Sequence, residues 1–146
     1  MSDQTRPVLP RSFYVVGAVA LVWNLIGMAT YVNQVTMDAA TLAAMPIEQQ
    51  GLYDNIPVWV TSAYAIAVTA GVLSSALLLM RSAWAVVGFT ISLLGVCLQM
   101  LHSLLMTEAI AIIGPSVVIG PILIIAAGVA LLYYSLKVRQ RGWLSR

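Results

Sequence analysis

Charged residues interrupt this chain only outside four long apolar stretches, and the two signs of charge occupy alternate gaps. Apolar stretches of about 20 residues are long enough to cross a bilayer as helices, and basic connections stay in the cytoplasm. The pattern predicts four membrane-spanning helices, with both termini and one short turn in the cytoplasm. The seven basic residues are Arg6, Arg11, Arg81, Lys137, Arg139, Arg141 and Arg146. Four of the five acidic residues fall in the other two gaps, namely Asp38, Glu48, Asp54 and Glu108.

The composition excludes a water-soluble globular protein. Hydrophobic residues make up 61% of the 146 positions and charged residues 8%, and the mean hydropathy is +0.95. Too little polar surface remains to cover a soluble globule. The net charge of +2 comes from groups at helix ends, which we interpret as topology signals and lipid head-group contacts, with no nucleic-acid surface. Cys97 is the only cysteine, so the chain cannot form an internal disulfide.

We expect an all-α fold: a four-helix transmembrane bundle that forms one domain over residues 1–146. The predicted helices cover residues 13–37, 57–80, 83–107 and 116–136, followed by a basic cytoplasmic tail at 137–146. The first apolar run, of about 24 residues, exceeds the apolar region of a signal peptide, so we expect a retained helix. Asp38 and Pro46 are suited to begin short helices, so residues 38–56 are predicted to form an amphipathic outer cap. A solvated loop is the alternative for this segment.

Small and polar residues recur at helical spacing and predict the inward faces, because helices in lipid associate through such residues. The seam of the first helix comprises Gly17, Ala20, Asn24, Gly27, Tyr31, Gln34 and Asp38. The seam of the third comprises Gly88, Ser92, Gly95, Gln99, His102 and Met106, and the second helix offers Ala63, Ala67, Ala70 and Ser74. If the first and third seams face each other, an outward-opening polar pocket forms beneath the cap. Its candidate ligand-binding residues are Asn24, Tyr31, Gln34, Asp38, Gln99, His102 and Glu108.

Each candidate also has an ordinary structural interpretation. Asn24 at mid-depth is typical of a residue that hydrogen-bonds to a neighbouring helix, and His102 is typical of a core or interfacial hydrogen bonder. A single histidine without recognised metal spacing predicts no metal site. The chain also lacks the sequence motifs of nucleophilic, metal-dependent and phosphate-binding enzymes. We therefore expect no catalytic residues, no cofactor and no enzymatic activity.

Several short runs carry a family resemblance. They are Leu21-Val22-Trp23-Asn24-Leu25-Ile26-Gly27, Pro57-Val58-Trp59, Ala65-Ile66-Ala67-Val68 with Gly71, and Leu77 to Arg81 with Trp84-Ala85. Over nearly the whole chain this set resembles small bacterial four-helix membrane proteins, some of which carry a loose sugar-transporter label. The resemblance implies a multi-pass protein of the bacterial inner membrane but names no reaction. Small multidrug exporters are similar in size, yet Asn24 stands where they have an intramembrane glutamate, so their proton coupling is not implied.

Two functional hypotheses follow from these features. The first is a non-enzymatic inner-membrane protein that acts by association, as a homo-oligomer or as an accessory subunit beside other membrane subunits. The alternative is a carrier or binding protein for a small neutral, sugar-like solute or a lipid-like ligand. The lipid bilayer is the common partner in both, and neither hypothesis involves nucleic acid.

Overall fold

The computed structural model describes residues 8–54 and 56–145, and over these ranges the fold is helical and contains no strand. Four helices are long enough and apolar enough to cross a membrane, which confirms the predicted all-helical fold with four apolar helices. The long helices are α1 (Arg11–Val35), α4 (Val58–Leu79), α5 (Trp84–Leu101) and α7 (Ile119–Gln140). The short segments are α2 (Ala39–Ala43), α3 (Ile47–Tyr53), the π-helix η1 (His102–Met106), α6 (Ala109–Ile113) and the 3₁₀-helix η2 (Pro115–Val118).

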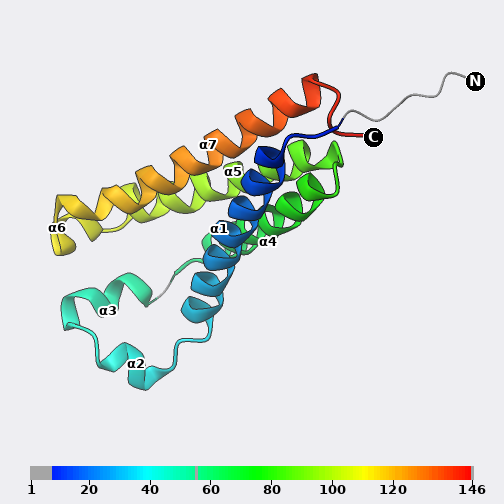
Figure 1. The fold of residues 1–146 in the computed structure, drawn as a ribbon. Helices are drawn as coiled ribbons and strands as arrows, with labels where there is room; N and C mark the ends of the chain where they lie inside the picture. The colour runs from blue at the N-terminus through cyan, green and yellow to red at the C-terminus, as the bar shows by residue number, and fades with distance from the viewer. Residues whose placement is uncertain (1–7, 55, 146) are drawn as a thin grey trace, which may run out of the picture.

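The long helices pack in the order α1, α4, α5, α7, so that α4 and α5 lie in the middle. Figure 1 shows that α1 and α7 lie close together near the chain termini and diverge toward the opposite end. At that opposite end α3 packs against α6. The bundle is therefore closed at the end that carries the termini and open between α1 and α7 farther along.

Close packing of α4 against α5 depends on glycines in the predicted seam. A Cβ on Gly95 would lie 2.8 Å from the carbonyl oxygen of Ala63 and 3.0 Å from Cβ of Ala67. A Cβ on Gly88 would overlap Oγ of Ser74. These residues have no side chain, so the two helices approach closely along most of their length.

A cluster of buried hydrophobic residues lies at the end that carries the termini. Phe13, Leu78 and Val138 are almost completely buried there and come from three different helices. The chain after α7 completes this cluster: Gly142 turns it back with φ of 71°, and Leu144 packs against the others. The C-terminal segment, residues 141–145, therefore belongs to the packed end of the bundle.

Backbone hydrogen bonds attach the C-terminal segment to the turn between α4 and α5. The amide of Ser145 donates to the carbonyl of Arg81 at 2.7 Å, and the amide of Ala83 donates to the carbonyl of Ser145 at 2.8 Å. Nε of Arg81 donates to the carbonyl of Trp143 at 3.2 Å. Arg81 adopts a left-handed backbone conformation with φ of 64°, which allows this tight turn.

The observed helix ends differ from the expected spans in two informative places. The third span consists of α5 followed by a π-helical segment, and no sequence signal marked that change of winding. In the fourth, α7 continues beyond residue 136 to Gln140, so Lys137 and Arg139 lie on its last turn. Basic side chains there interact favourably with the helix dipole, which helps to explain the extension.

Candidate ligand-binding groove

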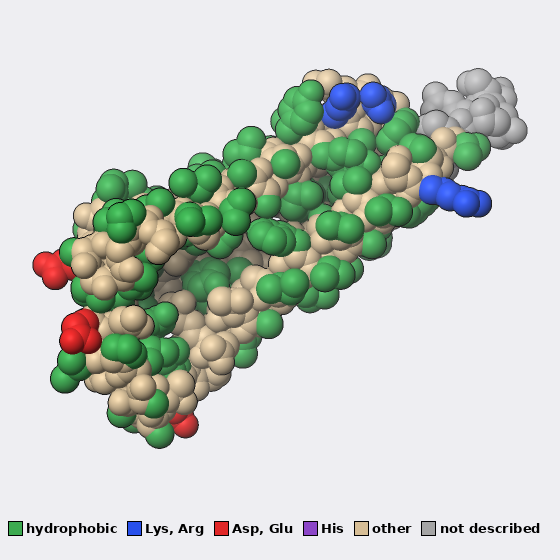
Figure 2. Space-filling view, turned by 60° about the vertical axis from the view of Figure 1, so that its left-hand side comes forward, with side chains coloured by type: hydrophobic (Ala, Val, Ile, Leu, Met, Phe, Trp, Pro, Cys, Tyr) green, Lys and Arg blue, Asp and Glu red, His purple; other side chains and the backbone are tan. Residues whose placement is uncertain are grey.

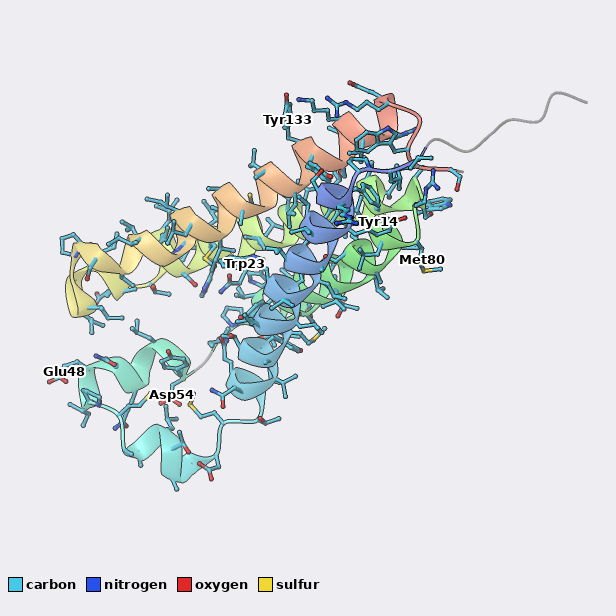
Figure 3. The ribbon with its side chains drawn as sticks, in the orientation of Figure 1. Tyr14, Trp23, Glu48, Asp54, Met80 and Tyr133 are labelled. Carbon is cyan, nitrogen blue, oxygen red and sulfur yellow. The ribbon has the colours of Figure 1, made fainter. Side chains whose placement is uncertain are left out.

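A groove of about 200 Å³ lies between α1 and α7, with α4 and α5 as its floor. Most of its lining is apolar and includes Trp23 and Gly27 from α1, Leu93 from α5 and Leu131 from α7. Figure 2 shows a hollow between the two limbs of the molecule, with hydrophobic side chains along both limbs. In Figure 3, Trp23 lies on the side of α1 that faces the space toward α7. Because α1 and α7 are the outer helices, the groove opens sideways.

Asn24 of α1 contributes an amide to the lining of this groove. Its Nδ2 donates to the carbonyl of Ala20 at 2.8 Å and to Oγ of Ser75 on α4 at 3.1 Å. Ser75 in turn donates to the carbonyl of Gly71 at 2.9 Å. Asn24 therefore joins α1 to α4 by a hydrogen bond, as expected from its mid-helix position.

The amide oxygen of Asn24 accepts no hydrogen bond from the described residues. Every buried side-chain nitrogen and oxygen among those residues has a partner, so this oxygen is not fully buried. It lies where a Cβ on Gly71 would be, and Oγ of Ser92 lies 3.1 Å from the same position. Ser92 is satisfied, since it donates to the carbonyl of Ala67 at 2.7 Å. Asn24 lines the largely apolar groove, and its Oδ1, which lies against Gly71, has no hydrogen-bond donor among the described residues.

Gln99 lines both the groove and a second cavity of about 230 Å³. The second cavity is also lined by Gln34, His102 and Ser103, together with apolar residues that include Leu52 of α3. Nε2 of Gln99 lies 3.5 Å from Oγ of Ser103, at the long limit for a hydrogen bond. The side chains that line this cavity come from α1, α3, α4, α5 and the segments that follow α5.

A third cavity of about 450 Å³ is lined by Glu48, Asp54 and Glu108 and shares His102 with the second. Glu48 and Asp54 lie on or next to α3, as Figure 3 shows. The imidazole of His102 packs edge-on against Trp59 with ring centroids 5.5 Å apart. Within the described residues, no group of three or more potential metal ligands is close enough to hold an ion.

The seven candidate residues thus do not share a single pocket. Asn24 lines the groove, Gln34 and His102 line the second cavity, Gln99 lines both, and Glu108 lines the third cavity. The remaining two candidates line none of these three cavities. They are Tyr31, which packs edge-on against Tyr64 at 5.2 Å, and Asp38, which caps α2.

The first and third seams each pack mainly against α4, and they approach each other at Gly71, where Asn24 and Ser92 both lie. The seam of α5 contacts the face of α4 that contains Ala63 and Ala67, whereas Asn24 of α1 contacts Ser75 on another face. Sequence analysis missed this second face of α4. Its signal was the helical spacing of Tyr64, Val68, Gly71 and Ser75.

Charge divides the molecule into two ends. The described basic residues lie at the start of α1, at the turn after α4 and at the end of α7 and beyond, which Figure 2 shows as blue atoms toward the termini. The described acidic residues lie at the opposite end, around α2, α3 and α6. The groove runs between these two charged ends.

Comparison of the chain with protein-family models, with curated proteins and with solved structures finds no match. The resemblance to small bacterial four-helix membrane proteins stays a prediction.

Proposed function

We propose that this chain is a non-enzymatic membrane protein that binds a lipid-like ligand in the groove between α1 and α7. The observation that carries the proposal is the combination of an apolar, sideways-opening groove with a lining residue, Asn24, whose amide oxygen has no donor among the described residues. A molecule dissolved in the bilayer reaches such a groove without crossing water. Concave apolar sites with few polar groups are typical of ligand binding.

The free acceptor favours a ligand that carries a hydrogen-bond donor. Leaving an amide oxygen without a hydrogen bond in an apolar medium costs roughly 1–3 kcal/mol of free energy relative to pairing it. Neither hydrocarbon chains nor the neighbouring Ser92 can supply that donor, because Ser92 already donates to Ala67. A ligand with a hydroxyl or N–H group would satisfy Asn24 and would be held in one orientation.

The setting of this function is part of the same proposal. We place the chain in a bacterial inner membrane with both termini in the cytoplasm, supported by the position of the basic residues at one end of the bundle. The cavities around α3 then face outward, and α2 and α3 form the outer cap. Ligand would enter from the lipid and move toward the outer end.

A filled groove tests the proposal. A Cβ on Gly27 would meet only Val68, at 3.7 Å, so Gly27→Leu adds bulk to the groove without an overlap at Cβ. Gly120→Leu is the matched control, because a Cβ there meets nothing within 4 Å. We expect native mass spectrometry to show about tenfold less retained lipid for Gly27→Leu, equivalent to ~1.4 kcal/mol, and wild-type retention for the control. Equal retention by all three proteins would contradict the proposal.

The second candidate function is association through α7. The most apolar stretch of Pro115–Gln140 contains no buried residue, so much of this helix lacks a partner within the chain. A helix of a second copy or of another subunit would then occupy the groove. In that case wild type would run as an oligomer in mild detergent and Gly27→Leu as a monomer. The small-residue seams give this alternative less support than expected, because the seams of α4 and α5 are used inside the chain.

A further inference from the structure

The groove and the second cavity adjoin at Gln99, which lines both. Their volumes are about 200 and 230 Å³. Each is smaller than the roughly 300 Å³ at the lower end of small-molecule sites, whereas together they exceed it. This relation suggests one ligand that extends through both spaces.

The two spaces differ in chemistry. The groove is apolar along most of its length, whereas the second cavity gathers hydrogen-bonding groups from Gln34, Gln99, His102 and Ser103. The amides supply donors and acceptors together, as does the serine hydroxyl, and none of them carries a permanent charge. Such a set matches hydroxyl groups, which also donate and accept.

The π-helix η1 begins at His102, directly after α5 ends. Its wider winding changes the direction of the side chains that follow, and π-helical segments are frequent at functional sites. Ser103 lies within it and faces Gln99 at the long distance of 3.5 Å. That pair is loosely joined, so both groups are available to a ligand.

Charge at this end disfavours an anionic head group. The described basic residues lie at the other end of the bundle, and the adjoining third cavity is lined by Glu48, Asp54 and Glu108. A phosphate would find carboxylates nearby and no lysine or arginine from the described chain to pair with. Like charges without a compensating partner repel, so lipids with a net negative head group are selected against.

Resting on the proposed function, we infer that the ligand is a neutral amphiphile with a hydroxyl-bearing head group. Its hydrocarbon chain lies along the apolar side chains of the groove, such as Leu93 and Leu131, and its head group reaches from Asn24 into the cavity lined by Gln34, Gln99, His102 and Ser103. Gln99 lies where the two spaces adjoin and hydrogen-bonds to the head group there.

Three photoreactive probes with the same diazirine-bearing oleoyl chain test this inference: a monoacylglycerol, a lysophosphatidic acid and a fatty-acid methyl ester. The protein is held in phosphatidylcholine nanodiscs, and labelled peptides are located by mass spectrometry. We expect the monoacylglycerol to label the groove about tenfold more than either other probe, as one or two hydrogen bonds allow. Gln99→Leu should abolish this preference and leave labelling by the methyl ester unchanged. Gln140→Leu, at the opposite end of the bundle, is the matched control.

The possible failures separate the two proposals. Equal labelling of the groove by all three probes would overturn the head-group inference while supporting a lipid-binding groove. Preference for the lysophosphatidic acid would also overturn it. If each of the three probes labelled the wild-type protein no more than it labels Gly27→Leu, the proposed function itself would be overturned. Ser103→Ala provides a second variant if Gln99→Leu does not fold, and it should reduce the same preference.

Discussion

At the residue scale, Gly71 of α4 lies next to polar side chains of both α1 and α5. The absence of a side chain there leaves room for the amide oxygen of Asn24 from one neighbour and the hydroxyl of Ser92 from the other. The position of the Asn24 amide oxygen therefore depends on Gly71, although Gly71 has no side chain with which to form a hydrogen bond.

We predict that Gly71→Ala destabilises the protein by roughly 1–3 kcal/mol, because the new Cβ would overlap the Asn24 amide and lie 3.1 Å from Ser92 Oγ. Thermal unfolding in detergent measures the change. Adding Asn24→Ala should recover part of the loss, since it removes the overlapping group. If the double variant loses the sum of both single effects, the two residues do not meet as described.

Asp38 provides a residue-scale prediction on pH. Hydrogen bonds from the side chain and amide of Thr41 lower the pKa of the Asp38 carboxyl below its usual value. A group whose pKa is lowered by folding stabilises the folded form above its ordinary pKa. The cap of α2 should therefore be intact at neutral pH and weaken as pH falls through that lowered pKa. Amide exchange at Thr41 should accelerate in acid, and Asp38→Asn should remove this pH dependence.

At the element scale, the C-terminal segment stabilises the packed end of the bundle. Leu144 is only 8% exposed and packs with residues of α1, α4, α5 and α7. We predict that Leu144→Ala destabilises the protein by about 2 kcal/mol, through lost contacts and a residual cavity. Leu136→Ala, at an exposed position of α7, is the control and should cost less. Equal changes in melting temperature would contradict a packed role for the segment.

Sequence patterns predicted where the helices lie in the chain better than which helices pack against one another. Hydropathy located the four long helices, and the spacing of Gly88, Ser92 and Gly95 identified a face of α5 that packs closely. Spacing places residues on a face of one helix but does not say which helix covers it, so it did not identify Ser75 of α4 as the partner of Asn24. The return of the C-terminal segment depends on contacts between Trp143 or Ser145 and Arg81, which are far apart in sequence.

At the scale of the whole molecule, the orientation of the chain remains a prediction from charge. Cysteines introduced at Ala40 and Gln140, both exposed, report on opposite ends in a Cys97→Ser background. We expect an impermeant thiol reagent to label Ala40→Cys in intact cells and to label Gln140→Cys only after lysis. Labelling of Gln140→Cys in intact cells would reverse the proposed orientation.

The sideways opening could not be predicted from the sequence for a physical reason. Lipid-facing and groove-facing positions are both apolar in a membrane protein, so hydropathy does not distinguish a helix face that meets another helix from one that meets lipid. Trp23 illustrates this. Its neighbours in sequence are as apolar as the rest of α1, yet its side chain lines the groove and is 44% exposed. Only the arrangement of all four helices shows that α1 and α7 diverge.

This divergence gives the molecule a broader cross-section at the end away from the termini (Figure 1). A body of that shape displaces more lipid area from one leaflet than from the other and acts as a wedge. In the proposed orientation the outer leaflet is the more crowded one, so its surface should become convex around the protein. We therefore expect fluorescently labelled protein, reconstituted with its broad end outward, to be denser per membrane area in small vesicles than in large ones. A density independent of vesicle diameter would show that lipid filling the groove restores an even cross-section.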